Sequence, residues 1–117
     1  MRVLIVDDQD EVATSLADGL GMRGYETVVA HDAPTALLAC TSFKPDVALL
    51  DIALPVIDGY ELGNRLRRCG VSRLVAVTGT AHAERSREAG FQAHLDKPVT
   101  IDGLDRVLRT LGESQDA

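Results

Sequence analysis

Short apolar runs alternate along the chain with longer segments in which apolar residues recur at helical spacing. Runs of four or five apolar residues are typical of strands that are buried on both faces, as in a parallel sheet. Strands of this kind that alternate with helices predict βαβ units and an α/β fold. Five strand–helix pairs are expected, with strands at residues 3–6, 26–30, 47–51, 74–78 and 93–96.

The segments between the strands carry helix start and stop signals. The first helix is expected at residues 10–23, with Gly24 as the residue that ends it. Asp58 can cap a third helix and Thr100 can cap the last one. The segment at residues 81–89 is polar on nearly every side, so we expect it to be the least firmly docked helix. The apolar positions expected to face inward from the first and last helices are Val12, Leu16, Ala17, Leu20, Ile101, Leu104, Val107, Leu108 and Leu111.

Polar side chains stand where four of these strands end. Asp7 and Asp8 follow the first strand, and Asp51 ends the third. Thr78 ends the fourth strand, and Lys97 follows the fifth. Each of these residues alone has an ordinary structural explanation, such as a strand-end turn or a surface lysine. Parallel strands end at one edge, where open α/β sheets form their ligand crevice, so the shared position predicts a phosphoryl-transfer pocket.

The three carboxylates also indicate a cofactor. Asp7, Asp8 and Asp51 would repel one another if they were crowded together, so either some of them hold protons or a cation neutralises them. A small set of oxygen ligands with room for water suits Mg²⁺, which uses few carboxylates and shares its other positions with water and phosphate oxygens. We therefore expect Mg²⁺ as the cofactor, with these three aspartates as ligands.

In order and spacing, these residues resemble the receiver domain of two-component response regulators, the phosphorylation module that histidine kinases address. The resemblance covers nearly the whole chain. The motifs that carry it are Asp7-Asp8, Asp51, the loop at residues 54–59, Thr78-Gly79 and Lys97-Pro98. It implies a flavodoxin-like, doubly wound, five-stranded parallel sheet of (βα)5 form, with strand order 2-1-3-4-5. It also implies the backbone carbonyl of Ala53, two residues past the acceptor, as a further metal ligand.

The resemblance assigns a role to each polar residue at the sheet edge. Asp51 would be the nucleophile that takes a phosphoryl group from a phosphohistidine or a small phosphodonor. Lys97 would supply positive charge, and Thr78 would donate a hydrogen bond to the phosphoryl group. The partners implied are a histidine kinase or histidine phosphotransfer protein and a downstream protein target. We therefore expect a phosphorylatable switch rather than a turnover enzyme, with slow loss of its own phosphate as a side activity.

Two further positions bear on the switch. His94 stands where receivers usually carry a tyrosine or phenylalanine that moves inward when phosphate recruits Thr78. A histidine that simply faces the core or solvent is the alternative. The Lys97-Pro98 peptide bond is a candidate for the cis form. Residues 81–89 and the fifth strand lack the dense charge of receivers that dimerise through this face, so a monomer or weak dimer is expected.

Composition narrows the setting of this chain. Its 117 residues suit one domain, expected at residues 1–112, with 113–117 as a C-terminal tail. The net charge of −6 argues against a nucleic-acid groove, which needs clustered Lys and Arg. Cys40 and Cys69 show neither zinc-ligand spacing nor a disulfide framework. The sequence has no basic and apolar leader and no apolar run of membrane length, so a reduced, cytoplasmic setting is expected.

Two other protein classes share parts of this pattern. Haloacid-dehalogenase-type phosphatases also form an aspartyl phosphate beside Mg²⁺, but they need a second acid where this chain has Ala53. A flavodoxin-like nucleotide or flavin binder needs a phosphate-cradling loop after the first strand, where Asp7 and Asp8 would repel a phosphate. The receiver is therefore our leading interpretation, either as a free-standing regulator or as part of a larger protein such as a hybrid histidine kinase.

Overall fold

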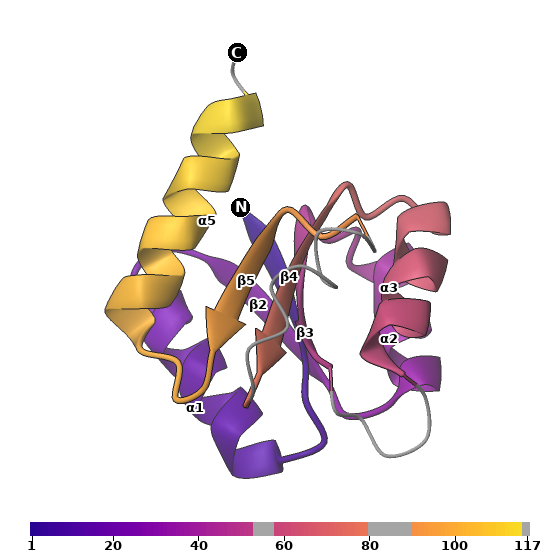
Figure 1. Cartoon of the computed structure of the whole chain (residues 1–117), viewed down its shortest axis with the longest axis horizontal. Helices are drawn as coiled ribbons and strands as arrows, with labels where there is room; N and C mark the ends of the chain where they lie inside the picture. Colours follow the sequence, from indigo (N-terminus) through magenta and orange to yellow (C-terminus); the bar gives the residue numbers. More distant parts are fainter. Residues whose placement is uncertain (53–57, 80–89, 116–117) are drawn as a thin grey trace.

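One parallel sheet forms the centre of the computed structural model, which describes residues 1–52, 58–79 and 90–115 (Figure 1). The strand order is β2-β1-β3-β4-β5, and all neighbours are parallel. The strands are β1 (Arg2–Val6), β2 (Glu26–Ala30), β3 (Val47–Asp51), β4 (Arg73–Thr78) and β5 (Ala93–Asp96). The described helices are α1 (Asp10–Gly21), α2 (Ala33–Ser42), α3 (Gly59–Arg68) and α5 (Ile101–Gln115). The predicted fold and strand order are confirmed, while the helix expected at residues 81–89 lies outside the described residues.

Alternate residues of the strands face two separate hydrophobic cores. In β1, Val3 and Ile5 pack towards α1 and α5, whereas Leu4 and Val6 pack towards α2 and α3. The two pairs of helices cover opposite faces of the sheet (Figure 1). Successive side chains of a strand point to opposite faces, so each inner strand contributes to both cores. All five residues of β3 are buried. The carboxyl end of β3 therefore lies in the middle of the sheet edge, between the ends of β1 and β4.

A glycine ends α1 as predicted. Gly24 has φ of +93°, a conformation that glycine adopts without strain. The Tyr25 N–H donates to the Leu20 carbonyl at 3.2 Å, and the Gly24 N–H donates to the Gly21 carbonyl at 3.2 Å. These two bonds form a Schellman motif. The α-helix proper therefore ends at Gly21, two residues before the predicted Arg23, because the last turn belongs to that motif.

The inward face of α1 differs from the prediction at Val12, whose side chain is 40% exposed. Ala13 and Leu20 are fully buried. The helical i, i+3, i+4, i+7 positions of this face are Ala13, Leu16, Ala17 and Leu20. Val12 precedes that series by one residue, about 100° around the helix axis, so it points away from the core.

Helix α5 packs on the sheet through its predicted apolar stripe. The fully buried or nearly buried positions are Leu104, Leu108 and Leu111. The predicted cap is confirmed, because Thr100 Oγ1 accepts from the Gly103 N–H at 3.0 Å. The helix continues to Gln115, although a tail was expected from residue 113, since Glu113 and Gln115 are good helix formers. Within the described part of the chain, the helices are too short or too polar to cross a membrane.

Candidate functional site

Three aspartates meet at the carboxyl edge of the sheet. Asp7 follows β1 and Asp51 ends β3, and both are 4% exposed, whereas Asp8 is exposed. One oxygen from each carboxylate lies within 4.8 Å of the other two. This set of oxygen donors fits one small, hard cation such as Mg²⁺. The structure thus brings together the three side chains that the sequence assigned to a metal.

The electrostatics of this cluster centre on Asp7. Burial raises the pKa of the Asp7 carboxyl, and the negative charges of Asp51 and Asp8 raise it further. The Gln9 N–H donates to Asp7 Oδ1 at 2.9 Å and acts in the opposite direction, as does the charge of Lys97. A cation held between the carboxylates would relieve their mutual repulsion. The donor set and the charge at this edge therefore both favour a bound cation.

Lys97 and Thr78 reach the same edge from the strands beyond β3. Lys97 Nζ lies 3.3 Å from Asp51 Oδ2. Thr78 is the last residue of β4 and is 4% exposed. The Lys97 N–H donates to the Thr78 carbonyl at 2.8 Å, so the main chain after β5 is held against the end of β4. The Lys97-Pro98 peptide bond is cis.

The first residue of helix α3 lies against the main chain of Asp51 and Ile52. Asp58 caps the helix as predicted, accepting from the Tyr60 N–H at 2.8 Å. The Gly59 N–H donates to the Ile52 carbonyl at 3.2 Å. A Cβ atom on Gly59 would lie 2.7 Å from Ile52 Cα and 3.0 Å from the Asp51 carbonyl oxygen. Glycine therefore lets α3 approach the main chain of Asp51.

His31 also lies at this edge, a contact that was not predicted. It directly follows β2, the neighbour of β1. Its Nδ1 lies 3.0 Å from the Asp7 carbonyl oxygen, and its Nε2 lies 3.2 Å from Asp10 Oδ1. The sequence did contain a signal for this position, because His31 follows the second predicted strand and parallel strands end at the same edge. His31 thus links the loop after β1 to the start of α1.

Two predicted residues stay without a structural test. His94 lies in β5, with its side chain 14% exposed and its Nε2 2.8 Å from Asp96 Oδ1. Residues 80–89 lie outside the described part of the chain, so a switching role for His94 stays a prediction. Ala53 and residues 54–57 are also outside the described residues, so the carbonyl ligand stays a prediction.

A pocket of about 440 Å³ opens beside the aspartate cluster. Asp7 and Lys97 contribute its charged part, and Val12, Leu16 and Pro98 contribute apolar surface. The exposure of Val12, which the amphipathic pattern did not predict, is explained in part by this position on the rim. The pocket connects the charged edge of the sheet to an apolar strip on α1.

Residues 3–109 of the chain match the protein-family model that is described as the response regulator receiver domain. The sensor histidine kinase RcsC of Escherichia coli strain K12 is 37% identical over 97% of this chain and 12% of its own length. The response regulator MprA of Mycobacterium avium is 35% identical over 95% of this chain and 50% of its own length. The chain therefore spans half or less of the length of these relatives.

Solved structures give the same result. The BeF3-activated receiver domain of Klebsiella pneumoniae RstA has a TM-score of 0.85 and 30% identity, covering 94% of this chain and 97% of that one. A CheY-like receiver domain from Methanospirillum hungatei has a TM-score of 0.85 and 33% identity, covering 98% and 96%. These matches do not support the haloacid-dehalogenase-type alternative.

Proposed function

Because the chain belongs to the response regulator receiver domain family, whose members are phosphoacceptor switches, we propose that Asp51 is its phosphoacceptor. One observation carries this assignment. The buried Asp51 carboxylate ends the central strand, pairs with Lys97, and has Asp7 and Asp8 oxygens within 4.8 Å. A nucleophile, a fixed positive charge and a set of metal ligands are thus gathered at one point.

The proposed reaction is transfer of a phosphoryl group from a phosphohistidine. An Asp51 carboxylate oxygen attacks phosphorus, the O–P bond of an aspartyl phosphate forms, and the P–N bond breaks with its electron pair left on the imidazole. The transition state is loose and its charge lies on the equatorial oxygens, so positioned positive charge matters more than a general base. The Lys97 ammonium is already beside the attacking carboxylate.

Receiver domains generally bind Mg²⁺ at an acidic pocket, and we propose that Asp7, Asp8 and Asp51 hold it here. When bound, Mg²⁺ offsets the negative charge that develops on the phosphoryl oxygens. The Gln9 N–H donates to Asp7 Oδ1 at 2.9 Å, and this hydrogen bond helps to orient the Asp7 carboxylate. Ala53 would add its carbonyl, as the family pattern implies.

Phosphorylation would alter contacts made by Lys97 and Thr78. Before transfer, the Lys97 ammonium pairs with the Asp51 carboxylate. The phosphoryl group carries negative charge beyond that carboxylate, so Lys97 and the Thr78 hydroxyl are placed to turn towards it. Lys97 follows β5, Thr78 ends β4, and His94 lies on β5. The proposed output is a change of the β4–β5 surface that a downstream protein reads.

The pocket beside Asp7 indicates where the phosphodonor docks. A histidine kinase or phosphotransfer protein must bring a phosphoimidazole to Asp51 over the carboxyl edge. Val12, Leu16 and Pro98 offer apolar surface next to that point. We infer that an apolar surface around the donor histidine covers Val12 while the imidazole enters beside Lys97.

Intact-mass spectrometry tests the acceptor assignment. With acetyl phosphate and Mg²⁺, the wild-type chain should gain one phosphoryl group, and Asp51→Asn should gain none. Asp18→Asn, at an exposed position on α1, is the control and should behave as wild type. Phosphoryl addition that persists in Asp51→Asn would place the acceptor at another residue.

A further inference from the structure

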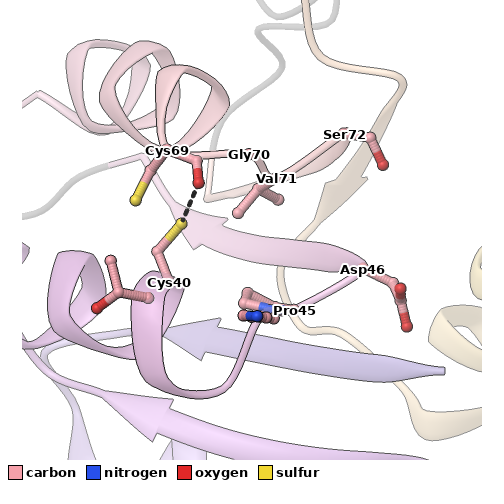
Figure 2. Close-up of a pocket in the computed structure, with 9 residues that line it drawn as sticks. Cys40, Pro45, Asp46, Cys69, Gly70, Val71 and Ser72 are labelled. Atoms are coloured by element: carbon pink, nitrogen blue, oxygen red, sulfur yellow. Dashed lines mark hydrogen bonds between the residues drawn. The ribbon is translucent and has the colours of Figure 1, made fainter.

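Two cysteines lie at the ends of helices α2 and α3, which pack on the same face of the sheet (Figure 1). Cys40 is in the last turn of α2, and Cys69 is the C-cap residue of α3. Cys40 Sγ donates to the Cys69 carbonyl oxygen at 3.3 Å, and the two thiols also interact with each other. Figure 2 shows both sulfur atoms in the space between the two helix ends.

The end of α3 fixes the position of Cys69. Gly70 has φ of +113°, and its N–H donates to the Arg67 carbonyl at 3.1 Å. The Val71 N–H donates to the Leu66 carbonyl at 3.1 Å. These are the two bonds of a Schellman motif, so the backbone of Cys69 is held in one conformation. The Cys40 thiol, which donates to the Cys69 carbonyl oxygen, therefore lies beside a residue whose main chain is held in place.

The two thiols differ in access to solvent. Cys40 is 3% exposed, and its pKa is raised to about 12, mainly by burial and further by its contact with the Cys69 thiol. Cys69 is exposed. Both line a pocket of about 470 Å³ that also includes Lys44 and Asp46 (Figure 2). A small polar oxidant in the pocket therefore reaches Cys69 first.

We propose that Cys40 and Cys69 form a reversible disulfide when the protein meets a hydroperoxide. The Cys69 thiolate attacks a peroxide oxygen, the O–O bond breaks, and Cys69 becomes a sulfenic acid with release of water or an alcohol. Cys40 Sγ then attacks the Cys69 sulfur, the S–O bond breaks, and the proton of Cys40 leaves with the hydroxide as water. Two thiols lose two electrons and one hydroperoxide gains them. Thiol exchange with a cellular dithiol reverses the bond.

This bond would enclose the proposed phosphoacceptor. The sequence separation between the cysteines is 29 residues, and the segment between them contains β3, Asp51 and the whole of α3. A disulfide here restrains the unfolded chain and fixes the end of α2 against the end of α3. The modification thus gives the α2–α3 face a response to oxidation that is separate from the chemistry at Asp51.

Thiol chemistry on the full chain tests this inference. A brief exposure to hydrogen peroxide should give a monomer that has lost two hydrogen atoms, with one Cys40–Cys69 cross-link in a peptide map. The melting midpoint should rise by about 5 °C or more and return on treatment with dithiothreitol. Dimers linked through Cys69, or over-oxidation of Cys69 without the cross-link, would overturn the proposal, as would an unchanged melting midpoint in the cross-linked protein.

Single variants test the order of the two steps. Cys40→Ser should accumulate a sulfenic acid on Cys69 that dimedone traps, whereas Cys69→Ser should stay unmodified under the same exposure. Oxidation of Cys40 at an equal rate in Cys69→Ser would show that the exposed thiol does not react first. Asp51→Asn should form the disulfide as readily as wild type, so failure here is distinguishable from failure of the phosphoacceptor assignment.

Discussion

Lys97 Nζ lies 3.3 Å from Asp51 Oδ2, and the lysine side chain is 32% exposed while that of the aspartate is 5% exposed. The pair therefore joins a buried carboxylate to an ammonium that solvent still reaches. Such an ammonium can follow a negative charge that moves outward when the carboxylate is phosphorylated. The relationship makes Lys97 the residue best placed to couple the chemistry of Asp51 to the β5 end of the sheet.

Removing the Lys97 ammonium should therefore weaken the conformational response more than removing the Thr78 hydroxyl. Thr78→Ala should still bind beryllofluoride with Mg²⁺ but show a reduced conformational response, because one hydrogen bond to the phosphoryl mimic is lost. Lys97→Ala should reduce the response further, because a charge-assisted contact is lost. Amide chemical-shift changes in NMR measure both. Wild-type shift changes in both variants would contradict the proposed coupling.

The aspartate cluster should make stability depend on Mg²⁺. Saturating Mg²⁺ should raise the melting temperature by mass action, and Asp8→Ala should lose most of that rise. The same variant should be at least as stable as wild type without metal, because one of three mutually repelling carboxylates is gone. Thermal melts with and without Mg²⁺ give the comparison. An equal rise in both proteins would rule out Asp8 as a ligand.

Val12 should matter for transfer from a protein donor and not for small donors. Val12→Lys places a charge on the rim of the pocket beside Asp7, so the rate of transfer from a phosphohistidine protein should fall about tenfold, which corresponds to ~1.4 kcal/mol. Phosphorylation by acetyl phosphate should keep its wild-type rate. Leu38→Lys is the matched control, since Leu38 is 71% exposed on α2. Equal loss in both variants would argue against the α1 strip as the docking surface.

Gly59 should tolerate no side chain. In Gly59→Ala the new Cβ would contact Ile52 Cα at 2.7 Å, so either α3 or the main chain at Asp51 must shift. The expected loss of stability is about 1–3 kcal/mol, as for other overpacked sites. Gly21→Ala is the control, because no atom lies within 4 Å of its added Cβ and it should stabilise α1 by ~0.5–1 kcal/mol. Urea unfolding measures both, and a neutral Gly59→Ala would show that the contact relaxes freely.

Asp105 should make stability fall in acid. The hydroxyl of Tyr25 donates to Asp105 Oδ1 at 2.5 Å, and Arg23 and Arg109 lie 2.9 and 3.2 Å from its oxygens. The pKa of Asp105 is lowered, first by the Tyr25 hydrogen bond and also by the two arginines. Its stabilisation is therefore complete above the unfolded-state pKa, near 4, and is lost as pH falls through the lower folded value.

The measurement for Asp105 is urea unfolding between about pH 7 and pH 3, across the unfolded-state pKa. The difference in stability between wild type and Asp105→Asn should be largest at neutral pH and should shrink in acid. Asp18→Asn, at an exposed position on α1, should show a small difference at every pH. A constant difference for Asp105→Asn would mean that its charge contributes nothing.

The sequence predicted most of this site because strand ends can be recognised one at a time. Asp7 and Asp51 each follow an apolar run and Lys97 follows the last short strand, and parallel pairing brings such strand ends to one edge without further information. Val12 was wrongly assigned to the inward face of α1. That face begins one residue later, at the small residue Ala13, and the larger apolar side chain of Val12 was taken for its start. The meeting of Cys40 with Cys69 was not predictable, since it depends on how two helix ends lie after two crossovers.

The alternation of strand side chains between two cores has a consequence for how such a chain can diversify. Leu4 packs only with the α2–α3 side and Ile5 only with the α1–α5 side. The two cores therefore share backbone but no side chains, and either can be repacked while the other keeps its sequence. A lineage could thus exchange the partner recognised by one face without disturbing the other face, provided that the strand ends with their acidic residues stay in place.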